Sequence, residues 1–347
     1  MPIAARRVYR LSLTMALALA AAYGLALPLP FLAPVFALLL TAAPGPPPGP
    51  KGLFGLILLL VITLGVGVLL IPLLQNYALT GVLLVAVGLY FSTYLTVHRG
   101  KALIGTFLTI GFTLISAAGT LDFGLAILVI KALVLGIAVA VVCQWIVYPW
   151  FPEHQATARA RKAEPPDTPQ SNWIALRAAL IVLPAYLLAL TNPAAYLAII
   201  MKSVSLAQQS SAVSARDAGR ELLGSTLLGG CFASLFWLAL KIQPNLWMFF
   251  LWMLLFGVYF AAKMFGVFAS RLPASFWLNV TLTMLILLGP AVEDSANGKD
   301  VYQAFVVRMG LFVAVTLYAW LALHLLEQLR MRRRRSRLTA CALPPGG

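Results

Sequence analysis

The sequence predicts an all-α integral membrane protein with about twelve transmembrane helices, arranged as two parallel six-helix repeats. Three observations support this fold class. Apolar residues make up 61% of the 347 residues and charged residues only 10%, which leaves too few polar side chains to cover a soluble globule of this size. A single polar stretch, residues 151–172, divides the apolar sequence in two. The two parts also match each other at one fixed offset.

The first half, residues 1–150, contains six apolar segments, most of which are long enough to cross a bilayer. They are residues 11–26, 31–43, 53–70, 80–97, 102–118 and 123–147. The arginines before the first segment also fit a cleavable signal peptide. A retained helix is favoured, because the second half opens with a similar unit, Arg177 followed by residues 178–190.

The second half, residues 173–329, repeats this plan and ends in a basic tail, residues 330–347. Its apolar segments are residues 174–190, 194–206, 222–240, 246–262, 273–288 and 301–326. With this number of spans, both termini and the 151–172 linker lie on the same side of the membrane. The linker carries Arg159, Arg161 and Lys162, and such Lys and Arg residues are typical of loops that remain in the cytoplasm.

The net charge of +15 raises the alternative of a nucleic-acid-binding protein, and the placement of the charge decides against it. In the predicted topology only Lys241 and Lys299 lie on the outer side, and only Lys131, Lys202 and Arg308 lie within spans. All other Lys and Arg residues lie on the cytoplasmic side, as the positive-inside rule requires. The charge therefore reflects membrane orientation.

The internal match occurs at an offset of 169 residues, which places Lys51 on Arg220, Gly88 on Gly257 and Tyr90 on Tyr259. The G-x-Y-F motif in the fourth segment of each half is its clearest part. Because each half has an even number of spans, both enter the membrane from the same side, and we expect an axis along the membrane normal to relate them. A shared site is then expected near that axis, and Tyr90 and Tyr259 are candidates for it.

Motifs for hydrolases, zinc proteases and phosphate-binding loops are absent from the sequence. The three cysteines have no C-x-x-C spacing, so they indicate neither a metal site nor a disulfide framework. We therefore expect no enzyme activity, no cofactor and no metal.

Two cations lie about two turns inside the predicted sixth and twelfth spans, Lys131 and Arg308. No carboxylate lies at a matching depth in the predicted spans, which suggests that the two side chains face each other across a path for an anion. The alternative is that each side chain snorkels to the nearby headgroups.

The second span of each half is only about thirteen residues long and follows a proline-containing turn, a pattern typical of discontinuous helices at binding sites. In the second half this span carries Lys202, with Gln208 and Gln209 just beyond it. A helix that simply ends near Lys202 at the membrane surface is equally compatible. Lys51 and Arg220, at the cytoplasmic start of each third span, either obey orientation alone or form a positive mouth that concentrates anions.

The stretch from Arg220 to Gly230 (RELLGSTLLGG) resembles the fusaric-acid-resistance and aromatic-acid exporter superfamily, in which the third helix of a half opens with a basic residue and glycine steps. The six-plus-six plan around a cytoplasmic segment is also similar. This resemblance implies a bacterial inner-membrane exporter of organic, often aromatic, carboxylates that works with a periplasmic adaptor of the membrane-fusion type.

The sequence thus predicts an efflux transporter for organic carboxylate anions, with a positively lined path between the repeats. Its predicted partners are the lipid bilayer, a small organic anion and the adaptor. The alternatives are a permease of another family, a non-transporting membrane subunit and an intramembrane enzyme. A major-facilitator transporter is disfavoured, because the loop before Lys51 (APGPPPGPKG) lacks the G-x-x-x-D-R-x-G signature.

Overall fold

A computed structural model describes residues 2–43, 45–153, 168–210, 215–298 and 300–341, and all regular structure within these ranges is helical. The first half contains α1 (Ile3–Gly24), α2 (Leu32–Ala42), α3 (Pro50–Asn76), α4 (Ala78–Arg99), α5 (Ala102–Ile110), the π-helical turn η1 (Gly111–Ile115), α6 (Ser116–Leu121) and α7 (Phe123–Val147). The second half contains α8 (Thr168–Thr191), α9 (Pro193–Ser210), α10 (Ala215–Ile242), α11 (Leu246–Met264), α12 (Ala274–Ala296) and α13 (Val301–Cys341).

Every apolar segment expected from the sequence coincides with helix, and α5, η1 and α6 together form the fifth segment. Among the described residues, nine helical segments are long and apolar enough to cross a membrane, which indicates a multi-pass membrane protein. The segments α1, α2 and α9 are not among the nine. The polar side chains of α9, with Lys202 at their centre, lower its hydropathy.

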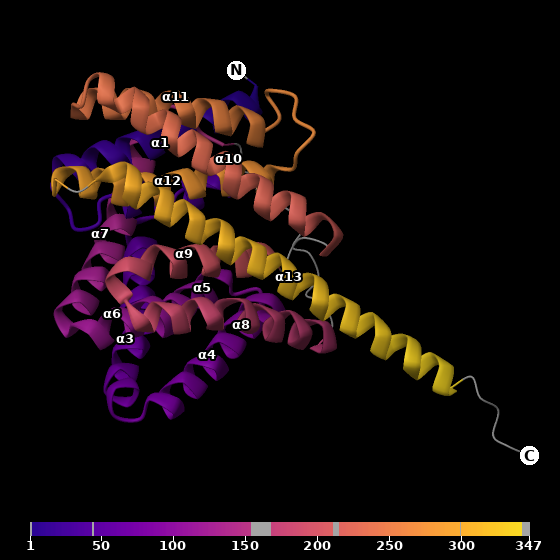
Figure 1. Ribbon diagram of the computed structural model, residues 1–347. Coiled ribbons are helices and arrows are strands. Elements are labelled where there is room, and N and C mark those ends of the chain that lie inside the picture. Colours follow the sequence, from indigo (N-terminus) through magenta and orange to yellow (C-terminus); the bar gives the residue numbers. More distant parts are fainter. Residues whose placement is uncertain (1, 44, 154–167, 211–214, 299, 342–347) are drawn as a thin grey trace, which may run out of the picture.

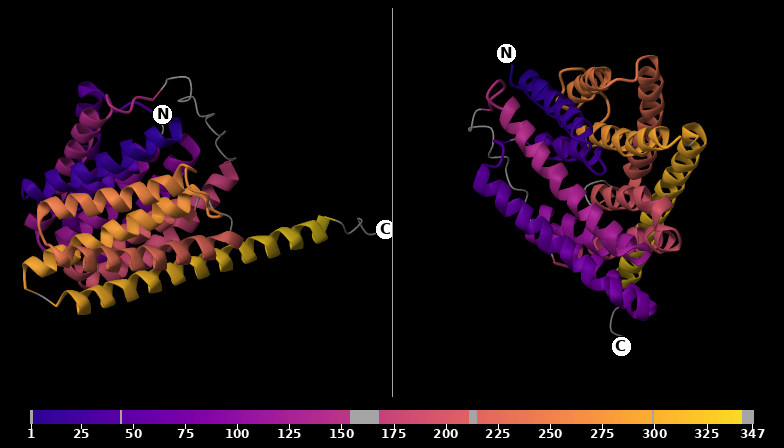
Figure 2. Two further views of the ribbon diagram at one scale, coloured as in Figure 1. Left: turned by 90° about the horizontal axis from the view of Figure 1, so that it is seen from above. Right: turned by 90° about the vertical axis from the view of Figure 1, so that its left-hand side faces the viewer.

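The bundle has two ends, which we call the linker end and the far end. At the linker end α1 begins, α7 ends and α8 begins, and α13 projects beyond the bundle from this end (Figures 1 and 2). The turns between α10 and α11 and between α12 and α13 lie at the far end (Figure 1). Capping fixes two of the helix starts, because Asp122 accepts a hydrogen bond from the Leu125 N–H and Asn245 accepts one from the Met248 N–H.

The two halves pack on each other through reciprocal pairs of helices. The helix α1, first in its half, packs most extensively on α11, which is fourth in the other half, and α8 packs in the same way on α4. The second helices behave alike, because α2 contacts α12 while α9 contacts α5, η1 and α6. Each half therefore has its first two helices seated against the fourth and fifth segments of its neighbour.

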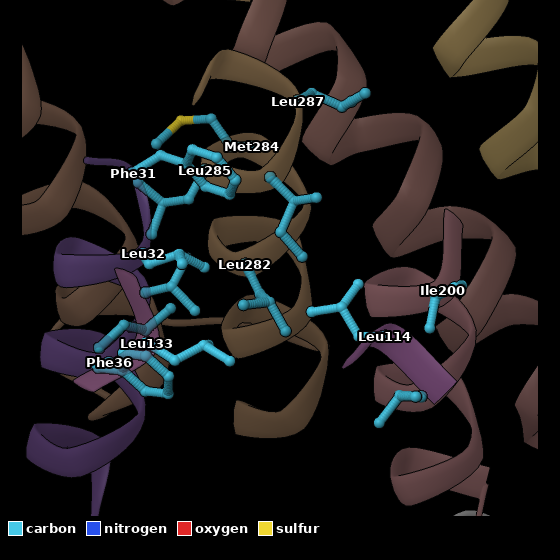
Figure 3. Close-up of a cluster of buried hydrophobic side chains, with 14 of the residues drawn as sticks. Phe31, Leu32, Phe36, Leu114, Leu133, Ile200, Leu282, Met284, Leu285 and Leu287 are labelled. Carbon is cyan, nitrogen blue, oxygen red and sulfur yellow. The ribbon is translucent and has the colours of Figure 1, made fainter. Parts of the chain in front are cut away.

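Apolar side chains fill the seam between the halves. Phe31, the residue before α2, lies beside Leu285 of α12, and Leu114 of η1 lies near Ile200 of α9 (Figure 3). The aromatic ring of Phe31 occupies the space beside Gly289, where a Cβ atom would come within 2.2 Å of the ring. In a multi-pass membrane protein such a cluster is stabilised by close van der Waals packing, because lipid is as apolar as these side chains.

Several helices extend beyond the predicted segments. The helix α13 continues to Cys341, so residues 330–341 of the predicted basic tail are helical. Two other extensions bear on the candidate site. The segment α9 is not short: it has 18 residues and continues to Ser210, because Ala207 and the two glutamines after it favour helix. The segment α12 continues through Pro290 to Ala296. A proline inside a helix of a bundle is tolerated, because neighbouring helices can satisfy the backbone groups that it leaves without a hydrogen bond. The second extension places Asp294 inside a helix rather than in a loop.

The closest backbone approach in the first half lies between α3 and η1. A Cβ atom on Gly67 would come within 2.0 Å of the Gly111 carbonyl oxygen, and one on Gly111 would come within 2.5 Å of the Thr63 carbonyl oxygen. Backbone atoms cannot move aside as a flexible side chain can. Glycine is therefore required on both sides of this crossing, and the π turn lies at the same place.

We predict that Gly67→Ala destabilises the protein by about 1–3 kcal/mol through overpacking against η1. The measurement is the thermal unfolding midpoint of the purified protein in detergent. Gly65→Ala is the matched control on the same helix, because a Cβ atom there meets nothing within 4 Å. Equal midpoints for the two variants would contradict the predicted crossing.

Candidate functional site

The most unusual side chain in the described part of the protein is Lys202, a lysine that is only 1% exposed. It lies on α9 and points toward α12, where its Nζ donates a hydrogen bond of 2.7 Å to Thr283 Oγ1 and one of 3.3 Å to Asn279 Oδ1. Thr283 and Asn279 are one helical turn apart, so both face the same side of α12. The lysine thus joins two helices through neutral acceptors.

The polar cluster continues from α12 into α10 and α13. Asn279 donates a short hydrogen bond from Nδ2 to Ser225 Oγ. One residue further along α10, the Thr226 and Thr316 hydroxyls are 3.3 Å apart and share a hydrogen bond with α13. All of these side chains are buried. The second half therefore contains a chain of polar contacts through its interior that ends at an ammonium group.

The charge of Lys202 has no carboxylate partner within the described residues. The ion pairs in these ranges join Arg7 and Arg10 to Glu153, Arg177 to Glu327, and Arg308 to Asp294. A buried cation held only by hydroxyl and amide oxygens is costly, because neutral dipoles replace the hydration of an ammonium group only in part. A buried ionisable group without a charged partner is a candidate functional group.

The structure does not pair the two cations expected to line an anion path. Arg308 donates from Nη1 to Asp294 Oδ2 at 2.5 Å, so the expectation that no carboxylate lies at its depth is wrong. The cause is the extension of α12 through Pro290. Lys131 is exposed on α7, which packs mainly on α1, α2, α3 and α6, whereas α13 packs on α8, α9, α10 and α12. Exposure of this kind fits the snorkelling alternative.

The structure places two of the remaining charged candidates, Lys51 and Lys202, and does not describe the side chains of the others. Lys51 is exposed in the first turn of α3. The side chains of Gln208, Gln209 and Arg220 lie outside the described residues, as do the linker arginines and Lys162. Lys202 is therefore the predicted path residue that the structure places in a polar site, and the alternative that the helix ends at Lys202 is wrong.

The two matched tyrosines differ in their contacts, because the one given for Tyr90 joins the two halves and the one given for Tyr259 lies within its own half. The Tyr90 hydroxyl donates to Asn172 Oδ1 of α8 at 3.1 Å, and Tyr259 packs edge-on against Trp277 at 6.0 Å between ring centroids. The matched glycines are both tightly packed. A Cβ atom would come within 2.7 Å of the Phe112 ring at Gly88 and within 2.8 Å of Met15 of α1 at Gly257.

Sequence reasoning missed a pair of similar ion clusters at the linker end. In the first half, Arg7 and Arg10 of α1 bind Glu153 after α7, and Arg10 lies over the Tyr148 ring. In the second half, Arg177 of α8 binds Glu327 of α13, and Arg330 lies over the Trp173 ring. Each cluster joins the first and sixth segments of its own half and contains two arginines for one glutamate.

The Glu153 carboxylate is the most enclosed acid of these clusters, with a side chain only 3% exposed. Burial alone raises the pKa of this carboxyl, but hydrogen bonds from Arg10, Arg7 and the Gly45 N–H hold it below its ordinary value of 4.5. A depressed pKa means that the folded protein stabilises the ionised form. This contribution is present at neutral pH and is lost as the pH falls through the folded-state pKa.

Comparisons with known proteins match only the first half of the chain. Residues 7–147 match the sequence model of a family described as a protein of unknown function (DUF2955). This region runs from α1 to the end of α7. No curated protein and no solved structure matches the chain.

We predict that Glu153→Gln lowers stability at pH 7 by about 3 kcal/mol, because it leaves two arginines without a carboxylate. The variant also loses most of the stability decline that the wild type shows below about pH 4. Thermal midpoints measured from pH 7 to pH 3 test both effects. Glu221→Gln is the control, since within the described residues Glu221 has a single long contact, the 3.4 Å hydrogen bond that it accepts from Ser275 Oγ. A pH profile of Glu153→Gln parallel to that of the wild type would refute the assignment.

Proposed function

We propose that the protein is an inner-membrane exporter of organic carboxylate anions and that Lys202 binds the anion during transport. The observation that carries this proposal is a fully buried ammonium group without a carboxylate in the described residues. A transported anion is the one counter-charge that can arrive and leave. Neutral acceptors from Thr283 and Asn279 hold the side chain between transport events.

The proposed architecture is two parallel six-segment repeats, in which all twelve segments cross or enter the membrane. The reciprocal contacts of α1 with α11 and of α8 with α4 support it, because a two-fold axis along the membrane normal exchanges these pairs. Parallel repeats place a transport route at their interface. The segment α9 lies at this interface and carries Lys202.

Two cavities lie on opposite sides of the apolar seam. They support a transport route for the anion that the seam closes at its centre. At the linker end, a cavity of about 250 Å³ lies between α4, α5, α8 and α9 and is lined by four threonines. At the far end, a larger cavity of about 620 Å³ lies between α1, α10, α11 and α12. The apolar seam lies near α9 and α12 between them (Figure 3). Transport therefore requires α9 to shift relative to α12.

The resemblance to aromatic-acid exporters suggests the substrate class and the outward direction. The family that matches residues 7–147 falls within the same broad group as these exporters. An aromatic monocarboxylate is the substrate to test first, and a periplasmic adaptor is the partner to test. A non-transporting membrane subunit is the second candidate, favoured by the ion pairs that tie helices together at the linker end.

We predict that Lys202→Met lowers the initial rate of efflux of radiolabelled benzoate or 4-hydroxybenzoate from preloaded cells at least about tenfold, because the anion loses its counter-charge. The protein should remain folded, since replacing a buried charge with an apolar side chain of similar length is often neutral for stability. Asn279 keeps its bond to Ser225.

Lys131→Met is the matched control, because it removes an exposed lysine from a helix of the same bundle. Its efflux rate should stay close to that of the wild type. Wild-type efflux no faster than that of cells lacking the protein would favour the non-transporting subunit. Unchanged efflux in Lys202→Met would remove Lys202 from the mechanism.

We also predict that the linker end faces the cytoplasm. A phosphatase reporter, which is active only in the periplasm, should be inactive when fused within the 151–172 linker or after Leu326 and active when fused in the turn after Ile242. The reason is the concentration of Lys and Arg at the linker end. The reverse pattern of activity would invert the topology.

A further inference from the structure

The Arg10 cluster adjoins a small cavity at the linker end of the first half. This cavity has a volume of about 120 Å³ and lies between α1, the end of α2, the proline-rich loop at residues 46–48 and the end of α7. The lining residues with polar side chains are Arg10, Thr41, Gln144 and Tyr148. It is distinct from the Lys202 site, which lies in the other half.

The cluster keeps an excess positive charge beside this cavity. Arg7 and Arg10 share the one carboxylate of Glu153, so one positive charge is not balanced within the described residues. The ion pair of Arg10 uses Nη2, and the guanidinium has further N–H groups on its other two nitrogens. Arg10 as a whole is only 4% exposed. A buried guanidinium at a cavity is a typical binding group for a bidentate oxyanion.

A second group in the same wall lacks a partner. Gln144 donates from Nε2 to Thr41 Oγ1 at 2.8 Å, and its Oε1 is buried without a hydrogen-bond partner in the described ranges. A buried acceptor without a donor is costly. A ligand that carries both oxyanion oxygens and a hydroxyl group can accept from Arg10 and, after a small rotation of the carboxamide, donate to Gln144.

We propose that this cavity binds a phosphate-type oxyanion that carries a hydroxyl group. Two sources share this chemistry, namely inorganic phosphate and the headgroup of an anionic lipid such as phosphatidylglycerol. The site lies at the end of the bundle where α1 begins and where a membrane surface rich in anionic lipid would be. It does not depend on transport through Lys202.

The experiment uses the full-length protein and measures ligand-induced shifts of the thermal unfolding midpoint. In the first arm, protein in detergent is compared in sodium phosphate and in sodium chloride of equal ionic strength. In the second arm, nanodiscs of phosphatidylcholine are compared with nanodiscs that also contain phosphatidylglycerol. A bound ligand stabilises the folded state by mass action, and we expect a rise of about 2–5 °C in at least one arm.

Two variants assign the shift to the cavity. Ala43→Leu fills part of the cavity without removing the Arg10–Glu153 pair, and it should abolish the shift. Arg10→Lys keeps a charge for Glu153 but loses the bidentate fork, and it should reduce the affinity about tenfold. Ala78→Leu, on an exposed residue at the start of α4, is the matched control and should keep the full shift.

A shift with phosphate in detergent identifies the free ion as a ligand, and a shift only with phosphatidylglycerol identifies the lipid headgroup. Both outcomes support the site when Ala43→Leu removes the shift. The absence of a shift in both arms overturns the proposal, as does a shift that is undiminished in Ala43→Leu. If Arg10→Lys fails to fold, the Ala43→Leu and Ala78→Leu pair decides the question.

Discussion

The reciprocal packing of the two halves is the constraint on which the rest of the structure depends. Because α1 packs on α11 and α8 packs on α4, neither half buries its own first helix within itself alone. The polar linker must therefore be long enough to carry the chain from the end of α7 to a helix that packs on the first half. This exchange also brings α2 and α9 to the centre, where the apolar seam forms.

Lys202 is a charged residue in packing between the halves that is otherwise mostly apolar. Around it, the packing of the second and fifth segments is apolar, as expected where no solvent enters. Lys202 is an exception on α9, and its contacts with Thr283 and Asn279 connect α9 to α12 in the place of apolar packing. An equivalent cation is absent from the described residues of α2, in which Thr41 is the one polar residue. The two halves are thus similar in packing but differ in chemistry at the position where a solute would pass.

The sequence was sufficient for the helical segments but not for the charge pairs. Hydrophobic runs locate a helix well, because the cost of placing polar groups in lipid is high. The end of α12 was misplaced because Gly289 and Pro290 favour a helix end locally, whereas packing in the bundle keeps the helix intact. That one error placed Asp294 in a loop and left Arg308 without a partner. By contrast, Asn279, Thr281 and Thr283 form a short polar stretch in an apolar segment, a signal that could have identified the partners of Lys202.

The ion clusters join the first and sixth segments of each half at the linker end. At the linker end, Glu153 ties α1 to the chain after α7, and Glu327 ties α8 to α13, so the first and sixth segments of each half are joined by charge. Buried ion pairs of this kind resist separation, because each partner would be left as an uncompensated charge. The contacts between the halves, in contrast, consist mostly of apolar side chains and isolated hydrogen bonds such as the one between Ser116 and Tyr186. Apolar surfaces lack the directional bonds that fix a register. The segment α9 differs from these joined segments, because hydrogen bonds from Lys202 to neutral groups of α12, and not an ion pair, hold its cation.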